Sequence, residues 1–223
     1  MTAKNSFNLF GVSNNKSPKS TKNNRFKFII IIFSIGFLTF LLFRPRALVI
    51  DTNTTWNNAG SPYYITENTY IRNGATLNID ASSGPVEVRF TGNYRLEVSD
   101  GLLDVNGTST NSVTFMHDSS SNPSSYYGLY VDSATGVATI EYADIKHANY
   151  GVNVNGGDLD IYDSTIQTNR YGIAVYDQGS ITTRRNVFKG NTEWPIGINP
   201  DCHNNVDFGT GADADVLGDG GAN

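Results

Sequence analysis

The segments YGLYV (127–131), YGVNV (150–154) and YGIAV (171–175) decide the fold of this chain. Each begins with tyrosine, glycine and an aliphatic residue and ends on valine, and their starting points lie 23 and then 21 residues apart. A period of about 20 to 25 residues, with short strands and no helical run, is typical of a β-solenoid. One unit cannot bury its own apolar residues, whereas stacked units enclose a continuous core.

A second apolar run follows each of these segments and precedes an asparagine by three or four residues. The pairs are Ile145 with Asn149, Ile166 with Asn169, and Val187 with Asn191. Stacking predicts ladders of identical residues, with aliphatic side chains inside, asparagines at the bends and tyrosines stacked at a corner. The glycine after each tyrosine is expected to permit a tight corner or a close approach of two backbones.

The chain before the repeats shows the same rhythm. Apolar and polar residues alternate, which indicates strands with one buried face, in 76–79, 86–90, 96–98, 103–108 and 113–115. The stretch 118–125 is nearly all Ser, Asn and Pro and is predicted as a surface loop, while 194–196 is expected to close a further coil. We therefore predict an all-β fold, with one parallel β-helix over residues 51–200.

A family resemblance follows from three further segments: GSPYYITENTYIRNGATLNID (60–80), YRLEVSDGLLDVNGTSTNSVTF (94–115) and YYGLYV (126–131). This series resembles the opening of the right-handed parallel β-helix repeat proteins of the pectin-lyase-like superfold, of the bacterial and archaeal surface type. The likeness covers about residues 56–191 and implies a single-stranded right-handed β-helix. It does not select an activity, because this superfold hosts lyases, hydrolases, adhesins and structural spikes.

The first 50 residues differ from the rest of the chain. Residues 1–27 are polar and basic and are predicted to be a disordered tail. Residues 28–43 form an apolar run flanked by Lys27 and Arg44, which we interpret as a transmembrane signal anchor, with a cleaved signal peptide as the alternative. Basic residues before this run place the tail in the cytoplasm and the body outside the cell or in the periplasm. A cleaved signal would instead give a secreted protein.

Charge content argues against nucleic-acid binding, and cysteine content argues against a disulfide-stabilised fold. Eight of the 16 basic residues precede residue 47 and all 21 acidic residues follow it, so the remainder carries 8 − 21 = −13. Such an acidic body does not favour nucleic-acid binding, which needs a basic surface. The single cysteine, Cys202, excludes an intrachain disulfide framework.

Candidate catalytic residues are few. Alternate residues of a strand share a face, so Asp158 and Asp160 could flank one outward groove, and Lys146 lies one coil earlier beside Asp144 and His147. Further basic candidates are Arg170, Arg184 and Arg185. The competing interpretation is that these are the polar outward positions that every solenoid strand carries. The hydrolase sets Asn-Thr-Asp, Asp-Asp and Gly-His-Gly do not occur, so an enzyme is the less favoured prediction.

The stretch 201–223 is rich in Gly and Asp and is predicted to form a final coil or a tail. Asp213, Asp215 and Asp219 are the candidate metal ligands, and Ca²⁺ is the cofactor that they would suit. Their spacing departs from that of a calcium loop, and no glutamate follows at the twelfth position. We therefore predict no cofactor.

Two functions remain open. The first is a membrane-anchored surface β-helix with a structural, adhesive or carbohydrate-binding role, whose partners are the membrane and a polysaccharide or another surface protein. Its candidate sugar-stacking residues are Tyr127, Tyr150 and Tyr171, which would otherwise form a buried corner stack. The alternative is a polysaccharide lyase or glycoside hydrolase. A third interpretation is a piece of a larger surface protein.

Overall fold

Three parallel seven-stranded sheets make up the fold. The computed structural model describes residues 47–210 and 215–217, and 1–46, 211–214 and 218–223 lie outside this description. Sheet A contains β1 (Leu48–Ile50), β4 (Thr69–Ile71), β7 (Arg95–Val98), β10 (Tyr126–Asp132), β13 (Ala148–Asn155), β16 (Tyr171–Tyr176) and β19 (Trp194–Ile198). Sheet B contains β2 (Thr54–Asn57), β5 (Ala75–Asp80), β8 (Gly101–Asn106), β11 (Val137–Glu141), β14 (Asp158–Tyr162), β17 (Ser180–Arg184) and β20 (Val206–Asp207). Sheet C contains β3 (Tyr63–Ile65), β6 (Val86–Phe90), β9 (Val113–His117), β12 (Ala143–Lys146), β15 (Thr165–Gln167), β18 (Val187–Lys189) and β21 (Val216–Leu217).

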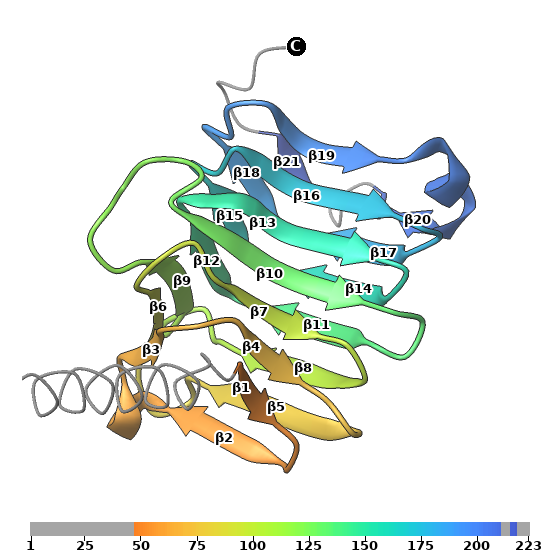
Figure 1. Cartoon of the computed structure of the whole chain (residues 1–223). Helices are drawn as coiled ribbons and strands as arrows, with labels where there is room; N and C mark the ends of the chain where they lie inside the picture. The colour runs from red at the N-terminus through yellow and green to blue at the C-terminus, as the bar shows by residue number, and fades with distance from the viewer. Residues whose placement is uncertain (1–46, 211–214, 218–223) are drawn as a thin grey trace, which may run out of the picture. The chain divides into compact units, whose positions relative to one another are not determined.

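Each strand pairs with the strands three places before and after it in the chain, so the backbone winds through A, B and C seven times (Figure 1). This is a parallel β-solenoid of about seven turns, which confirms the predicted architecture. Two short 3₁₀ helices interrupt the strands, η1 (Asn58–Gly60) and η2 (Pro200–Asn205). Strands β20 and β21 belong to the seventh turn and fall within the stretch 201–223.

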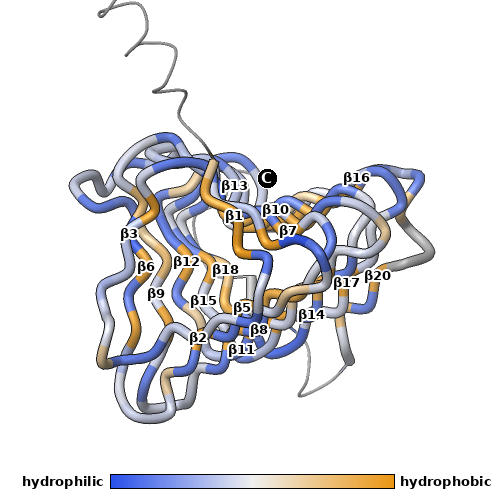
Figure 2. Tube along the Cα trace, turned by 60° about the horizontal axis from the view of Figure 1, so that its bottom comes forward, coloured by the Kyte–Doolittle hydropathy of each residue, from blue (hydrophilic) through white to orange (hydrophobic). Residues whose placement is uncertain are grey.

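The core is the space between the three sheets, which form its walls in Figure 2. Strict alternation in β5 and β6 places every second side chain inside. Parallel pairing then aligns equivalent residues of successive turns. In sheet A this produces a column of inward aliphatic residues, namely Ile50, Ile71, Val98, Val131, Val154 and Val175.

The second and third Tyr-Gly repeats occupy equivalent positions in sheet A, as predicted, whereas the first is offset at its start: Gly128 pairs with Tyr150, and the register shifts before Leu129 pairs with Val152. Tyr150 lies in register with Tyr171 and then with Trp194. A side chain at Gly128 would place its Cβ 1.7 Å from the carbonyl oxygen of Tyr150, and φ at this glycine is +127°. The glycine therefore permits a close approach between the backbones of neighbouring turns.

Two predicted details of the repeat are wrong. Ile166 pairs with Phe188, which is buried, whereas Val187 is only half-buried. The reason is spacing: the step from Ile145 to Ile166 is 21 residues, and the step to Phe188 is 22. Asn149 is not the equivalent of Asn169 and Asn191. The equivalent bend position in its turn is one residue earlier, at Ala148.

Buried asparagines form a ladder at the bend between sheets C and A. The Asn169 Oδ1 accepts from the backbone N–H of Ala148 at 2.9 Å, and the Asn191 Oδ1 accepts from the N–H of Asn169 at 3.1 Å. Their amide groups donate to the carbonyl oxygens of Ile145 and Ile166 at 3.0 and 2.9 Å. Backbone groups that face the bend are thereby satisfied across turns.

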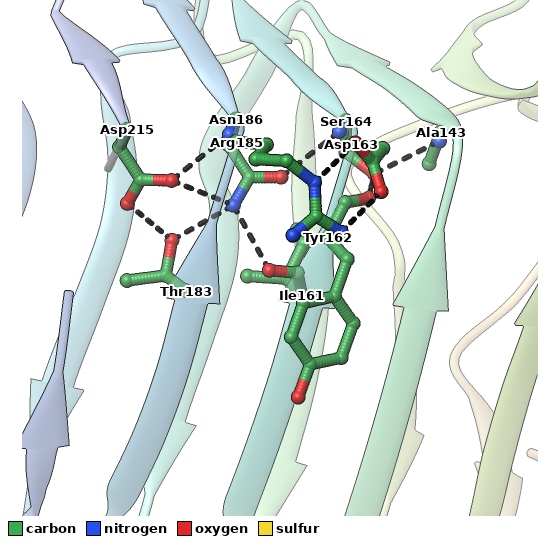
Figure 3. Close-up of polar contacts among 9 residues, drawn as sticks. All are labelled: Ala143, Ile161, Tyr162, Asp163, Ser164, Thr183, Arg185, Asn186 and Asp215. Atoms are coloured by element: carbon green, nitrogen blue, oxygen red, sulfur yellow. Dashed lines mark hydrogen bonds and ion pairs between the residues drawn. The ribbon is translucent and has the colours of Figure 1, made fainter. Parts of the chain in front are cut away.

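A second ladder, which the sequence analysis did not identify, lies at the bend between sheets B and C (Figure 3). The N–H of Ala143 donates to the Ser164 Oγ, the N–H of Ser164 to the Asn186 Oδ1, and the N–H of Asn186 to the Asp215 Oδ1, each at 2.9 Å. The residues that precede Ala143, Ser164 and Asn186 in the chain take a left-handed conformation, with φ between 50° and 56°. These single residues turn the chain from one sheet to the next.

The predicted surface loop 118–125 connects β9 to β10. The predicted tail 1–27 and apolar span 28–43 lie outside the described residues. Within the residues that the structure describes, no helix has the length and apolarity needed to cross a membrane.

Candidate carbohydrate-binding face

A ladder of aromatic rings runs along the outer face of sheet A. It begins with Tyr127 and continues through Tyr150 and Tyr171 to Trp194, one residue from each of β10, β13, β16 and β19. The successive ring centroids are 5.6, 4.9 and 4.6 Å apart. The structure thus brings the three candidate tyrosines together and adds a tryptophan at the end of their row.

The inner rings of this ladder have little free surface. Tyr171 stacks on Tyr150 with an interplanar angle of 23° and faces Trp194 at 33° on its other side. Its two ring faces therefore lie against neighbouring rings. The three tyrosines are half-buried, as expected for a corner stack.

Trp194 differs because it contacts only one ring of the ladder among the described residues. The indole packs over Gly197, where an added Cβ would lie 2.8 Å from the Trp194 Cε3. Despite this packing, 46% of Trp194 is exposed. The indole thus offers the free aromatic surface at this end of the row, supported from below by a residue without a side chain.

A hollow of about 380 Å³ lies beside the exposed indole. It is lined by Tyr176, Trp194, Ile196, Gly197, Ile198, Asn199 and Pro200. β19 is the last strand of sheet A among the described residues, so one side of its backbone has no strand partner there. The hollow therefore combines an aromatic surface and aliphatic side chains with a phenol, an amide and backbone polar groups.

Two tyrosines of sheet A, Tyr150 on β13 and Tyr130 on β10, have hydroxyl groups with a raised pKa. Burial is the largest cause that raises the pKa of Tyr150, and its hydroxyl also hydrogen-bonds that of Tyr176. Burial, helped by Asp132, raises the pKa of Tyr130 to about 12. These groups can therefore donate and accept hydrogen bonds over the whole physiological range.

Around β7 and β10, an ion pair within the chain covers the tyrosine rings of this face. The Arg95 guanidinium lies 4.9 Å from the ring centroid of Tyr130 and 5.7 Å from that of Tyr127. Its Nη2 lies 2.5 Å from the Glu97 Oε2, and Glu97 is only 3% exposed. Burial alone would lower the pKa of Arg95, but Glu97 and Tyr70 outweigh it and the pKa is raised. A guanidinium of the chain itself thus occupies the space among these rings.

The catalytic candidates do not gather at one place. Asp158 and Asp160 lie on β14 in sheet B, where the Asp158 Oδ1 accepts from the Ser180 Oγ at 2.6 Å. Lys146 lies on β12 in sheet C, and its Nζ is 2.6 Å from the Asp144 Oδ2. Sheets B and C are separate walls of the solenoid, so Lys146 is not brought beside the two aspartates.

The remaining basic candidates are engaged in ion pairs. Arg184 on sheet B pairs with Asp207, Arg185 at the bend with Asp163, and Arg170 with Glu193. His147 lies at the bend between sheets C and A, where its φ is 70°. Burial is the largest cause that lowers its pKa, so the imidazole is neutral at pH 7.

Of the candidate metal ligands, Asp215 closes the second bend ladder. Its carboxylate accepts from the Thr183 Oγ1 at 2.6 Å and from the Asn186 Nδ2 at 3.0 Å (Figure 3). Asp213 and Asp219 lie outside the described residues. Across the described part of the chain, no three His, Cys, Asp or Glu side chains are placed to hold a metal ion together.

Sequence reasoning missed Trp194 as a candidate binding residue because the tyrosine of the earlier repeats is replaced there. The spacing could have identified it, since Trp194 follows Tyr171 by 23 residues and is followed by Pro-Ile in place of Gly-Ile. No family model matches the chain, and comparison with curated proteins and with solved structures gives no significant match.

Proposed function

We propose that this chain is a surface β-helix that binds carbohydrate at the Trp194 end of sheet A. The observation that carries the proposal is the exposed indole beside a hollow lined with hydrogen-bonding groups. The faces of aromatic rings are electron-rich, and the C–H groups of a sugar ring pack against them. A site of this type holds the sugar by its apolar face and orients it through a few polar groups.

We further propose that the body acts outside the membrane, anchored by the apolar span 28–43. The uneven charge supports this topology, because the basic residues before the span suit the cytoplasmic side. We place the solenoid in the right-handed, pectin-lyase-like group of surface proteins. The parallel pairing and the one-residue bends support this placement. The lyase or hydrolase alternative gains no support, because Lys146 and the Asp158–Asp160 pair lie on different sheets.

The test is a glycan array probed with the full chain, purified in a detergent without a sugar headgroup, with and without Ca²⁺. A hit is then compared between the wild type and Trp194→Ala, which we expect to weaken binding by about tenfold or more, because a stacking platform is lost. Tyr64→Ala is the matched control, since Tyr64 is 51% exposed but lies on sheet C in the first turn. An array without any hit, or equal binding by both variants, would contradict the proposal.

A further inference from the structure

A second hollow, of about 300 Å³, lies on the outer face of sheet C. Its lining comes from strands β12, β15 and β18, from the neighbouring bends, and from the connection between β8 and β9, and comprises Thr108, Ser109, Ser112, Tyr142, Ala143, Asp144, Asp163, Thr165, Gln167 and Lys189. The hollow exists because the B-to-C connection differs between turns. At 142, 163 and 185 one left-handed residue suffices, whereas residues 107–112 form a longer loop that stands beside those tight bends.

The loop 107–112 forms one side of the hollow and is held in shape by hydrogen bonds within the loop. The backbone N–H of Thr108 donates to the carbonyl of Asn111 at 2.8 Å, and the N–H of Asn111 donates back at 3.2 Å. The Thr108 Oγ1 accepts a further bond from the N–H of Asn111 at 3.0 Å. At the base of the loop, a Cβ on Gly107 would lie 2.5 Å from the carbonyl oxygen of Tyr142. The loop is therefore tied to the next turn by direct backbone packing.

The two carboxylates of the hollow are fixed in place by partners from the chain. The Asp144 Oδ2 pairs with the Lys146 Nζ, and the Asp144 Oδ1 accepts from the Gln167 Nε2, both at 2.6 Å. Arg185 holds Asp163 in a bidentate pair, with bonds of 2.8 and 2.7 Å. The Asp144 and Asp163 side chains are only 21% and 24% exposed. Such groups are preorganised, because their rotamers are settled before a ligand arrives.

Charge balance decides the chemical class of the ligand. Each carboxylate already has a cationic partner, Lys146 for Asp144 and Arg185 for Asp163. Lys189 adds one further positive charge to the lining. The hollow thus has no excess of negative charge to attract a metal ion, and its one unmatched cation, Lys189, is solvent-exposed and provides little attraction for an anion. What it offers is a dense set of hydroxyl, carboxylate and amide groups that suit a neutral molecule with several hydroxyl groups.

We propose that the hollow on sheet C binds a neutral saccharide unit, with Asp144 and Gln167 as the orienting residues. Vicinal hydroxyl groups of a sugar match this pair, because the carboxylate accepts hydrogen bonds and the Gln167 carbonyl oxygen adds a further acceptor. The site is distinct from the one at Trp194, which lies on sheet A and depends on ring stacking. A chain with both sites would hold a polysaccharide at two places and gain avidity.

The experiment is saturation-transfer difference NMR on the full chain in a detergent without a sugar headgroup. The probes are the methyl glycosides of glucose, galactose and mannose, with galacturonate as the anionic probe. Each probe is measured first with the wild type and then in the Trp194→Ala background, which removes the first site and in which the further variants are made. We expect a signal from at least one neutral glycoside, about tenfold weaker affinity in Asp144→Asn, and loss of the signal in Thr165→Trp, which fills the hollow.

Asp158→Asn is the matched control, since Asp158 is also an aspartate that accepts a side-chain hydrogen bond but lies on sheet B. Circular dichroism of each variant verifies that the fold is kept. The proposal is overturned if no neutral glycoside gives a signal in the Trp194→Ala background. It is also overturned if Asp144→Asn behaves like Asp158→Asn, or if galacturonate binds more tightly than every neutral probe. Binding that Trp194→Ala abolishes would leave the proposed function standing and refute this second site.

Discussion

The hydroxyl of Tyr126 lies fully buried in the core and has no hydrogen-bond partner among the described residues. Its ring stacks on Phe90 at 4.1 Å, so the aromatic part is well packed. Burial is the main cause that raises the pKa of this phenol, and the hydroxyl stays neutral. The ring contributes to stability while its polar atom opposes it, because an unsatisfied buried donor loses its hydration without compensation.

Tyr126→Phe is therefore expected to stabilise the protein by about 1 kcal/mol, since it removes the unpaired hydroxyl and keeps the ring. The free energy of unfolding from urea titrations measures the change. Tyr64→Phe serves as the control and should have no effect, because Tyr64 is exposed. A clear destabilisation by Tyr126→Phe would mean that the hydroxyl has a partner in solution.

His147 makes stability depend on pH. In the folded chain its pKa is lowered, first by burial and then by Lys146, with His117 acting in the same direction and Asp144 against them. The unfolded chain has a pKa of about 6.5 at this residue. Protonation therefore favours unfolding, so the contribution is complete above about pH 6.5 and is lost as pH falls towards and through the lowered folded pKa.

We expect the Tm of the wild type to fall more steeply than that of His147→Gln between about pH 7.5 and 5. Thermal denaturation followed by circular dichroism across this range measures the two slopes. All other titrating groups are shared, so the difference isolates His147. Equal slopes of Tm against pH for the two proteins would show that the His147 imidazole has the same pKa in the folded and the unfolded chain.

At the scale of elements, the bends matter as much as the strands. Asn169 is fully buried, and its side chain satisfies the N–H of Ala148 and the carbonyl of Ile145. Loss of the amide leaves buried backbone groups of two turns without partners. Each such group costs about 1 to 3 kcal/mol.

Asn169→Ala is accordingly expected to destabilise the protein by about 3 kcal/mol, measured by urea denaturation. Asn149→Ala is the matched control in the preceding turn. Asn149 is half-buried and accepts one bond, from the Ser124 Oγ at 3.3 Å, so its loss should change stability by less than about 0.5 kcal/mol. Equal effects of the two variants would place Asn149 in the ladder instead.

The parallel sheets and the tyrosine stack could be predicted from the sequence because they repeat along the chain with nearly constant spacing. The second bend ladder was hidden, since its positions hold three different residues, Ser164, Asn186 and Asp215. Their common role is to accept a backbone N–H, which residue identity does not display. The hollow on sheet C was hidden for another reason: loop 107–112 and Gln167 meet only after three turns are stacked.

At the scale of the whole molecule, the solenoid is a stack in which each turn pairs only with the turns next to it. Stability of such arrays is close to a sum over turns and their interfaces. A turn can therefore be removed if the cut joins equivalent positions. His147 and Thr168 are equivalent, because both are left-handed bend residues between sheets C and A.

Deletion of residues 148–168 joins His147 to Asn169 and is expected to leave a folded six-turn solenoid with a lower Tm. Circular dichroism and size-exclusion chromatography measure the outcome. Deletion of residues 148–158 is the control, since it joins the same bend to the interior of sheet B and should abolish folding. Folding of both variants, or of neither, would contradict a stack of separable turns.

The two tryptophans of the chain stand in the first and the last turn, Trp56 on β2 and Trp194 on β19. Six steps of about 4.8 Å separate these turns, or about 29 Å along the stack. Tryptophan fluorescence, excited selectively so that the tyrosines do not contribute, is therefore a local signal from the first and the last turn of the solenoid. Two variants that each keep one tryptophan, followed in a denaturant titration, would show whether the first or the last turn unfolds first.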